Sequence, residues 1–272
     1  MLSFRDLVTG FRQLDIDHQK PGIIHASLSS FGEIRGGAET LLGALVSTFS
    51  SILSPTFTYK TMIIPETGPE NNGIKYGSGK NLNRMAEFFT ADMPADRLMG
   101  VISEKIRLHI QAQRSMHPIL SFSGINVPEA ISSQTLEDPL SPVQWLVDQQ
   151  GYVLLLGVDH TVNTSIHLAE QLVGRKSFVR WALSEDGILE CPRFPGCSRG
   201  FNQITPYIER ITSSVQVGNA SVHAIPVREM VKILLPVLQT DPKALLCETE
   251  DCERCNSVRF EVDNRTIDET NQ

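Results

Sequence analysis

YVLLLGVDHTVNTSIHLAE, residues 152–170, contains the strand-to-helix segment around which the rest of this chain is organised. Tyr152 to Val158 form a nearly continuous apolar run of strand length, which predicts a strand buried on both faces. Residues 163–165 are Asn, Thr and Ser, which are suited to capping a following helix. Polar side chains therefore gather where a buried strand gives way to a helix, and ligand sites in α/β sheets form at that edge.

Four ionisable side chains follow this strand, in the order Asp159, His160, His167 and Glu170. An imidazole titrates near neutral pH, so it can accept a proton from a reacting group. Glu170 lies three positions after His167, so on a helix the two side chains share a face. The pattern indicates acid–base chemistry. The alternative is that His167 is a structural histidine whose hydrogen bonds are satisfied within the core.

A second strand, turn and helix occur near the N-terminus. Residues 23–28 predict a short buried strand, residues 29–37 are rich in Ser and Gly, and residues 38–49 predict a helix. The free N–H groups and the dipole of such a helix can hold an anionic group. The stretch matches neither G-x-G-x-x-G nor the Walker pattern, so an ordinary strand-to-helix turn is the alternative.

The remaining pattern predicts an α/β class with a change of character near residue 174. Residues 1–174 alternate strands and helices, and we expect them to form the core domain with the catalytic site. Residues 175–260 contain two hairpin signals and predict a small hairpin-rich C-terminal subdomain that completes the site. Residues 261–272 are polar and predict a disordered tail.

Composition excludes several classes of protein. The chain has 272 residues, 41% of them hydrophobic, and a formal net charge of −7. A general nucleic-acid binder usually has a basic surface, so we expect no nucleic-acid partner. No apolar stretch reaches the roughly 18–20 residues that span a bilayer, and the N-terminus lacks the apolar core of a signal peptide, so we expect no membrane partner.

All five cysteines lie between Cys191 and Cys255. This clustering favours a reducing, cytoplasmic setting with thiols or metal ligands rather than a disulfide framework. The spacing Cys247-x₄-Cys252-x₂-Cys255, with Cys191 and Cys197 upstream, is compatible with a tetrahedral structural zinc site. The predicted ligands are Cys191, Cys197, Cys252 and Cys255, and free thiols are the alternative.

An ordered series of motifs resembles the aminoglycoside 3-N-acetyltransferase family. Residues 25–32, HASLSSFG, followed by Gly36-Gly37, resemble its H-S-S-L-S-S-F-G…G-G segment. Residues 114–118 resemble its R-S-x-H-P, and residues 154–170 resemble its L-L-L-G-V-G-H-D-x-N-T-S-L-H-L-A-E. Ser141-Pro142, residues 217–220 and residues 252–255 also have counterparts. The matches run in order across about residues 20–258.

The resemblance implies a mixed-sheet, three-layer acetyltransferase fold, with acetyl-CoA as donor and the 3-amino group of an aminoglycoside as acceptor. It implies that His167 is the general base and that Glu190 supports it, and Glu170 competes with Glu190 for that role. Residues along the cosubstrate would be His25, Ala26, Ser27, Leu28, Ser29, Ser30, Phe31, Gly32 and His117. Residues near the acceptor would be Asp159, His160, Asn163 and Thr164.

The chain also departs from this family pattern. The family's G-H-D becomes Asp159-His160-Thr161, and residues 60–83 do not resemble the aromatic- and acid-containing segment that helps to hold the antibiotic. Two alternatives therefore stay open. The acceptor is a different amino sugar or another small-molecule amine, or the chain is a non-catalytic binding protein that kept the fold. We expect a monomer or a homodimer.

Overall fold

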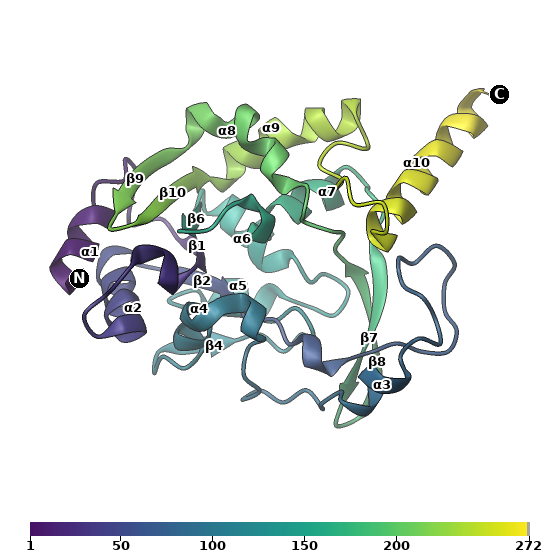
Figure 1. The fold of residues 1–272 in the computed structure, drawn as a ribbon, viewed down its shortest axis with the longest axis horizontal. Coiled ribbons are helices and arrows are strands. Elements are labelled where there is room, and N and C mark those ends of the chain that lie inside the picture. Colours follow the sequence, from purple (N-terminus) through teal and green to yellow (C-terminus); the bar gives the residue numbers. More distant parts are fainter. Residues whose placement is uncertain (271–272) are drawn as a thin grey trace.

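Seven strands form one mixed sheet in the computed structural model, which describes the backbone of residues 1–270 and the side chains of residues 1–264 (Figure 1). β1 pairs in parallel with β2 and β6, and the outer pairs of the sheet are antiparallel. Across the sheet the strands are β4 (Ala112–Arg114), β5 (Phe122–Ile125), β2 (Ile52–Pro55), β1 (Gly22–Ala26), β6 (Tyr152–Leu156), β10 (Ala220–Pro226) and β9 (Ser213–Val217).

The central strands are buried on both faces, as the apolar run predicts. On one face, Ile23 and Leu155 belong to a core with the helices α5 (Pro128–Ser133), α6 (Ser141–Asp148), α7 (Ile166–Leu172) and α9 (Val227–Thr240). On the other face, Ile24 and Leu154 pack with α1 (Phe4–Phe11), α2 (Gly37–Thr48) and α4 (Gly100–Arg107). The two cores give the predicted three layers, and this confirms the mixed α/β fold class.

A smaller antiparallel sheet stands beside the main one, on the opposite side of the molecule from α1 and α2 (Figure 1). It consists of β3 (Met62–Ile63), β7 (Phe178–Ser184) and β8 (Gly187–Phe194). Three further helices complete the chain, namely α3 (Lys80–Arg84), α8 (Thr205–Ile208) and α10 (Glu253–Thr270).

The structure divides residues 175–260 differently from the predicted subdomain. The first hairpin, β7–β8, lies in the small sheet, but the second, β9–β10, joins the main sheet because β10 pairs with β6. Hairpin signals are local, and they do not say which free sheet edge a hairpin will extend. The proposed boundary at residue 174 therefore does not separate two compact units.

The prediction of a disordered tail from residue 261 is wrong as far as Thr270, because α10 continues to that residue. The helix is anchored near its start, where Cys252, Cys255 and Val258 are buried in the main core. Once those turns are fixed, each further residue adds a backbone hydrogen bond without a new nucleation cost. Residues 271–272 of the predicted tail lie outside the described residues.

No helix in the described part of the chain combines the length and the apolar character that crossing a lipid bilayer requires.

Candidate active site

A cavity of about 850 Å³ opens at the carboxyl ends of β1 and β6, within the size range of small-molecule sites. One side of the cavity is formed by the end of β1 and the turn after it, namely residues 25–29 and Gly32, together with Gly37 at the start of α2. The segment from Val158 to His167, which follows β6, lines it as well. The remaining wall includes Phe194 to Gly196 at the end of β8, and Arg254 of α10.

His167 lies in this wall, and its imidazole is held in place from two sides. Its Nδ1–H donates to Glu170 Oε2 at 2.6 Å, and its ring packs against the ring of Phe201 with centroids 4.8 Å apart. Because Nδ1 carries the proton in this bond, Nε2 of the neutral ring keeps a lone pair. The arrangement supplies an oriented base in the cavity wall.

Glu170 is fully buried, so its charge needs partners. Burial acts to raise the pKa of Glu170, but the hydrogen bonds and charges of His167 and Arg175 outweigh it, and the net pKa is lowered. Arg175 Nη1 donates to Glu170 Oε1 at 2.7 Å, while its Nη2 donates to the carbonyls of Pro242 and Ala244. Glu170 is therefore held as a carboxylate at neutral pH.

The turn after β1 is tied to the turn after β6 by a hydroxyl network. Ser30 Oγ donates to the Gly157 carbonyl at 2.8 Å and lies within hydrogen-bond distance of Ser27 Oγ, at 2.9 Å. Gly157 has φ +67°, and a Cβ at this position would lie 2.5 Å from Ser30 Cβ. Glycine is therefore required both by the backbone conformation and by the close approach of the two turns.

Four buried cysteines, Cys197, Cys247, Cys252 and Cys255, form a cluster next to the cavity. Their sulfur atoms all lie within 4.8 Å of one another. The backbone N–H and Nε–H of Arg199 both donate to Cys197 Sγ at 3.5 Å. Cys197 follows the cavity-lining Gly196 directly, and Cys252 and Cys255 flank Arg254, so the cluster lies directly behind that wall.

Comparison with known proteins decides the family. The family model described as "Aminoglycoside 3-N-acetyltransferase" matches residues 23–239 of this chain. The chain belongs to the aminoglycoside 3-N-acetyltransferase family. This confirms the resemblance drawn from the motifs, and it places the chain in a family of acyltransferase enzymes.

Individual relatives agree with this assignment. An aminoglycoside N(3')-acetyltransferase-like prophage protein, YokD, of Bacillus subtilis is 31% identical over 162 residues, which cover 54% of this chain and 57% of that protein. Aminoglycoside N(3)-acetyltransferase IV of Salmonella is 29% identical over 192 residues, which cover 65% of this chain and 72% of the relative. The matched region thus spans little more than half of the Bacillus protein.

Solved structures share the fold. The apoenzyme of the aminoglycoside acetyltransferase AAC(3)-IVa superimposes with a TM-score of 0.77 at 23% identity, covering 95% of this chain and 97% of that one. The Bacillus subtilis YokD structure has the same TM-score and identity, covering 88% of this chain and all of that one.

The structure gathers most of the predicted cosubstrate residues along the cavity. His25, Ala26, Ser27, Leu28, Ser29 and Gly32 line it. Ser30 lies behind them and lines a shallower hollow near Asp159. Phe31 is buried in the core, with its ring edge-on to Phe11.

His117 does not line the cavity, in contrast to its predicted contact with the cosubstrate. Its Nδ1 accepts from the backbone N–H groups of Ile119 and Leu120, at 3.1 and 3.0 Å. Burial lowers the pKa of His117 to about 4, so its ring is neutral at pH 7. In this position the histidine shapes the turn that precedes β5.

Of the predicted acceptor residues, Thr164 lines the cavity, whereas Asn163 is fully buried beneath it. Asp159 accepts a hydrogen bond from Asn202 Nδ2 at 2.9 Å, and the His160 backbone N–H donates to Asn202 Oδ1 at 3.0 Å. Asn202 follows Phe201, which packs on His167. Asp159 and His160 therefore fix the turn that supports the His167 imidazole. Neither lines the main cavity, and Asp159 lines the adjoining shallower hollow.

The two competing glutamates are separated by the structure. Glu190 is exposed on β8, opposite Trp181 of β7, and does not line the cavity. Glu170 occupies the position next to His167 Nδ1. The carboxylate that contacts His167 is thus Glu170, the competing candidate on the same helical face, and not Glu190, which the resemblance implied.

The cysteine prediction needs one correction, because the cluster contains Cys247 where Cys191 was expected. Cys191 is buried within β8 near the carbonyl of Leu189, and burial raises the pKa of its thiol to about 12. Cys191 is held within β8, which ends at Phe194, and its side-chain direction is set by the alternation along the strand. Cys197 lies beyond the end of β8, in the loop that brings it to the cluster.

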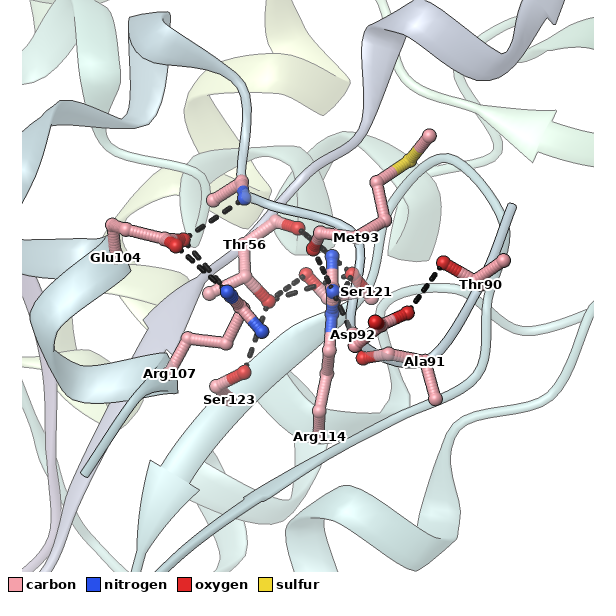
Figure 2. A network of polar contacts seen from close by, with 11 residues as sticks. Thr56, Thr90, Ala91, Asp92, Met93, Glu104, Arg107, Arg114, Ser121 and Ser123 are labelled. Atoms are coloured by element: carbon pink, nitrogen blue, oxygen red, sulfur yellow. Dashed lines mark hydrogen bonds and ion pairs between the residues drawn. The ribbon is translucent and has the colours of Figure 1, made fainter. Parts of the chain in front are cut away.

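The R-S-x-H-P motif contributes a scaffold rather than a ligand contact. Figure 2 shows Arg114 reaching from β4 toward Thr56, Met93 and Ser121. Its Nη2 donates to the Thr56 carbonyl at 3.0 Å, its Nη1 donates to the carbonyls of Ala91 and Met93, and its Nε donates to Ser121. This network ties the segment 90–96 to the sheet beside the cavity.

Sequence reasoning missed Arg175 and Arg254. Arg175 follows α7 and pairs with Glu170, and a cation shortly after a buried carboxylate was an available signal. Arg254 lines the cavity from the first turn of α10. Residues 252–255 have a family counterpart, but the spacing of Cys252 and Cys255 around Arg254 pointed to a metal rather than to the cavity.

Proposed function

We propose that this chain is an acetyl-CoA-dependent N-acetyltransferase that moves the acetyl group directly to an amine, with His167 as general base. The observation that carries the proposal is the hydrogen bond between His167 Nδ1 and Glu170 Oε2, 2.6 Å long, in the wall of the cavity. It resembles the imidazole–carboxylate pairs that activate nucleophiles in other hydrolytic and transfer enzymes.

The chemistry follows from the charges. As the amine nitrogen attacks the thioester carbonyl, His167 Nε2 accepts a proton from it, and the ring becomes an imidazolium. The carboxylate of Glu170 stabilises that cation, and Arg175 keeps Glu170 ionised. When the carbon–sulfur bond breaks, the imidazolium can return the proton to the departing thiolate.

The cosubstrate fits the side of the cavity formed by the turn after β1. Ser27 and Ser29 supply hydroxyl donors there, and the N-terminus of α2 begins at Gly37, which also lines the cavity. Helix N-termini favour phosphate groups. A structural neighbour, AAC-IIIb, was solved as a binary complex with CoASH.

For the acceptor, the family implies the 3-amino group of an aminoglycoside. Structural neighbours were solved in complex with gentamicin, apramycin and sisomicin. A second candidate is a different small-molecule amine. It is favoured by one observation, namely that no Asp or Glu is among the described residues that line the cavity.

The test follows thiol release from acetyl-CoA with a panel of aminoglycosides and simpler amino sugars. His167→Ala is expected to lower kcat by about 10²–10⁴-fold, the usual contribution of a general base. The matched control is His109→Ala, which changes a histidine outside the cavity. Equal turnover in the wild type and in His167→Ala would contradict the role of His167.

We also propose that Cys197, Cys247, Cys252 and Cys255 hold a structural zinc ion. Four thiolates at about 2.3 Å from a tetrahedral zinc stand about 3.8 Å apart, which fits sulfur atoms within 4.8 Å of one another. The N–H donors of Arg199 suit a metal-bound thiolate at Cys197. The ion would tie the loop after β8 to the start of α10.

Metal analysis of the purified protein tests this site. We expect about one zinc per chain, lost in Cys252→Ser together with a lower Tm. Cys191→Ser removes a buried thiol outside the cluster and should keep the metal. Equal metal content in the two variants, or none in the wild type, would overturn the proposal.

A cytoplasmic location belongs to the same proposal. None of the five cysteines of the chain forms a disulfide in the structure. Cysteines without disulfides are typical of proteins in reducing compartments.

A further inference from the structure

We propose that Arg254 binds an anionic group of the acceptor, so that the preferred acceptor is an amine that also bears a carboxylate or a phosphate. This inference rests on the proposed transferase function and names the substrate class for it. It is carried by the charge of the cavity, by the contacts of Arg254 and by its position relative to His167.

The cavity wall has an unusual charge balance for a site that would hold a polycation. Arg254 contributes a guanidinium, and none of the described lining residues carries a carboxylate. The carboxylate nearest to the catalytic base, Glu170, is buried behind the wall and already shared by His167 and Arg175. Asp159 lines the adjoining shallower hollow, where it already accepts hydrogen bonds from Thr161 and Asn202. In the main cavity wall, an acceptor with several ammonium groups would therefore meet a cation and no counter-charge.

Arg254 is positioned, yet its charge is not neutralised. Its Nη1 donates to the Gly196 carbonyl at 2.8 Å and to the Pro195 carbonyl at 3.4 Å. Within the described part of the chain no carboxylate forms an ion pair with it. The fork of a guanidinium matches a carboxylate or a phosphate through two parallel hydrogen bonds, so its other N–H groups suit such a ligand.

The location of Arg254 puts this anion site close to the reacting amine. A Cβ on Gly196, whose carbonyl accepts from Arg254, would lie 3.9 Å from Glu170 Oε2. The anchor of Arg254 is thus a neighbour of the His167–Glu170 pair. The phosphates of a bound acetyl-CoA lie far from its thioester, whereas an acceptor must bring its amine to His167, so the acceptor is the ligand whose charge Arg254 meets.

Neighbouring polar groups complete the anion site. Tyr59 and Ser198 also line the cavity and offer hydroxyl donors. Cys252 and Cys255, on either side of Arg254, are buried in the hydrophobic core, so the start of α10 is packed against the molecule. The side chain is therefore held on a rigid support, as a residue that selects a ligand requires.

The experiment compares three kinds of acceptor. The probes are glucosamine 6-phosphate and muramic acid as anionic amines, glucosamine as the uncharged-substituent control, and kanamycin as a polycation. Binding is measured by titration calorimetry with CoA saturating, and KM and kcat are measured by thiol release. The proteins are the wild type, Arg254→Gln, Arg254→Lys and Arg210→Gln, the last removing one exposed arginine outside the cavity.

We expect the wild type to bind at least one anionic probe more tightly than glucosamine and kanamycin. In Arg254→Gln, Kd and KM for that probe should rise about tenfold or more, with the KM for acetyl-CoA unchanged. Arg254→Lys should recover only part of the affinity, because it lacks the fork. Arg210→Gln should match the wild type.

Two outcomes overturn the inference while leaving the transferase function intact. In the first, kanamycin is turned over with a lower KM than any anionic probe, and Arg254→Gln does not change that value. In the second, Arg254→Gln raises the KM for acetyl-CoA alone. Conversely, Arg254-dependent binding of an anionic probe without thiol release from any amine would support the anion site and overturn the proposed transferase.

Discussion

The His167 imidazole depends on two residues that lie close to it in the sequence, Glu170 and Arg175. Glu170 shares its helical face, and Arg175 holds Glu170 as a carboxylate through the 2.7 Å contact. In this chain of contacts Arg175 acts on the charge of Glu170, and Glu170 acts on the tautomer of His167. Substitutions at Glu170 and at Arg175 test these two contacts separately.

Replacing Glu170 by Gln should lower kcat by about 10²–10⁴-fold with little change in fold, because an amide can donate to Nδ1 and leave the proton on Nε2. Steady-state thiol release checks this. Glu190→Gln, at the exposed position on β8, is the control and should keep wild-type activity. A loss in Glu190→Gln with normal activity in Glu170→Gln would reverse the assignment.

Replacing Arg175 by Gln should shift the acid side of the pH profile. Arg175 helps to lower the pKa of Glu170, so its removal raises that pKa, and the carboxylate is lost at a higher pH. The acid limb of kcat should therefore move toward neutral pH. An unchanged limb would show that the charge of Glu170 does not depend on Arg175.

At the level of elements, the turns after β1 and β6 determine the shape of the cavity. Ser30 bridges them through the Gly157 carbonyl, and the two strands run in parallel with residues 22–26 opposite residues 152–156. Parallel pairing brings both carboxyl ends to one edge, so the predicted acid–base segment and the predicted anion-binding turn face the same space.

Gly157→Ala should destabilise this junction by about 1–3 kcal/mol, through strained backbone and the clash with Ser30. It should also raise the KM for acetyl-CoA. Gly174→Ala is a matched control, because Gly174 has φ +71° but a Cβ at this position would meet nothing within 4 Å. Urea unfolding of both variants separates the cost of the strained backbone from the cost of the clash with Ser30. An equal decrease in the free energy of unfolding in the two variants would show that the clash costs nothing.

At the level of the whole molecule, buried neutral histidines link stability to pH. Burial lowers the pKa of His25 to about 3 and that of His117 to about 4. The unfolded chain, with histidine pKa values of about 6.5, then binds more protons than the folded chain in acid. The contribution of these two histidines to the free energy of unfolding is therefore fully present above about pH 6.5, and it is lost as the pH falls toward their folded pKa values.

Urea unfolding should show the free energy of unfolding falling by up to about 1.4 kcal/mol per pH unit for each of these histidines below pH 6. In His117→Asn the slope should be shallower than in the wild type, whatever the change in absolute stability. His109→Asn, at a histidine outside the buried set, should keep the wild-type slope. A slope that is the same in all three proteins would contradict the assignment.

Features that depend on local periodicity followed from the amino-acid sequence alone. The apolar run at 152–158 specified a strand buried on both faces, and the i, i+3 spacing brought His167 and Glu170 together because helix geometry fixes that distance. The ordered motifs specified the family. Polar composition alone was a poor guide to the end of the chain, where α10 continues to Thr270.

Which residues distant in sequence come into contact is visible only in the folded molecule. The second hairpin extends the main sheet, Cys247 takes the place predicted for Cys191, and Arg254 reaches the cavity. These contacts join segments about 50 or more residues apart, and their closure depends on the packing of both cores rather than on local spacing. Local rules fix the geometry within a turn of helix, whereas the partners across the molecule follow from how the elements pack.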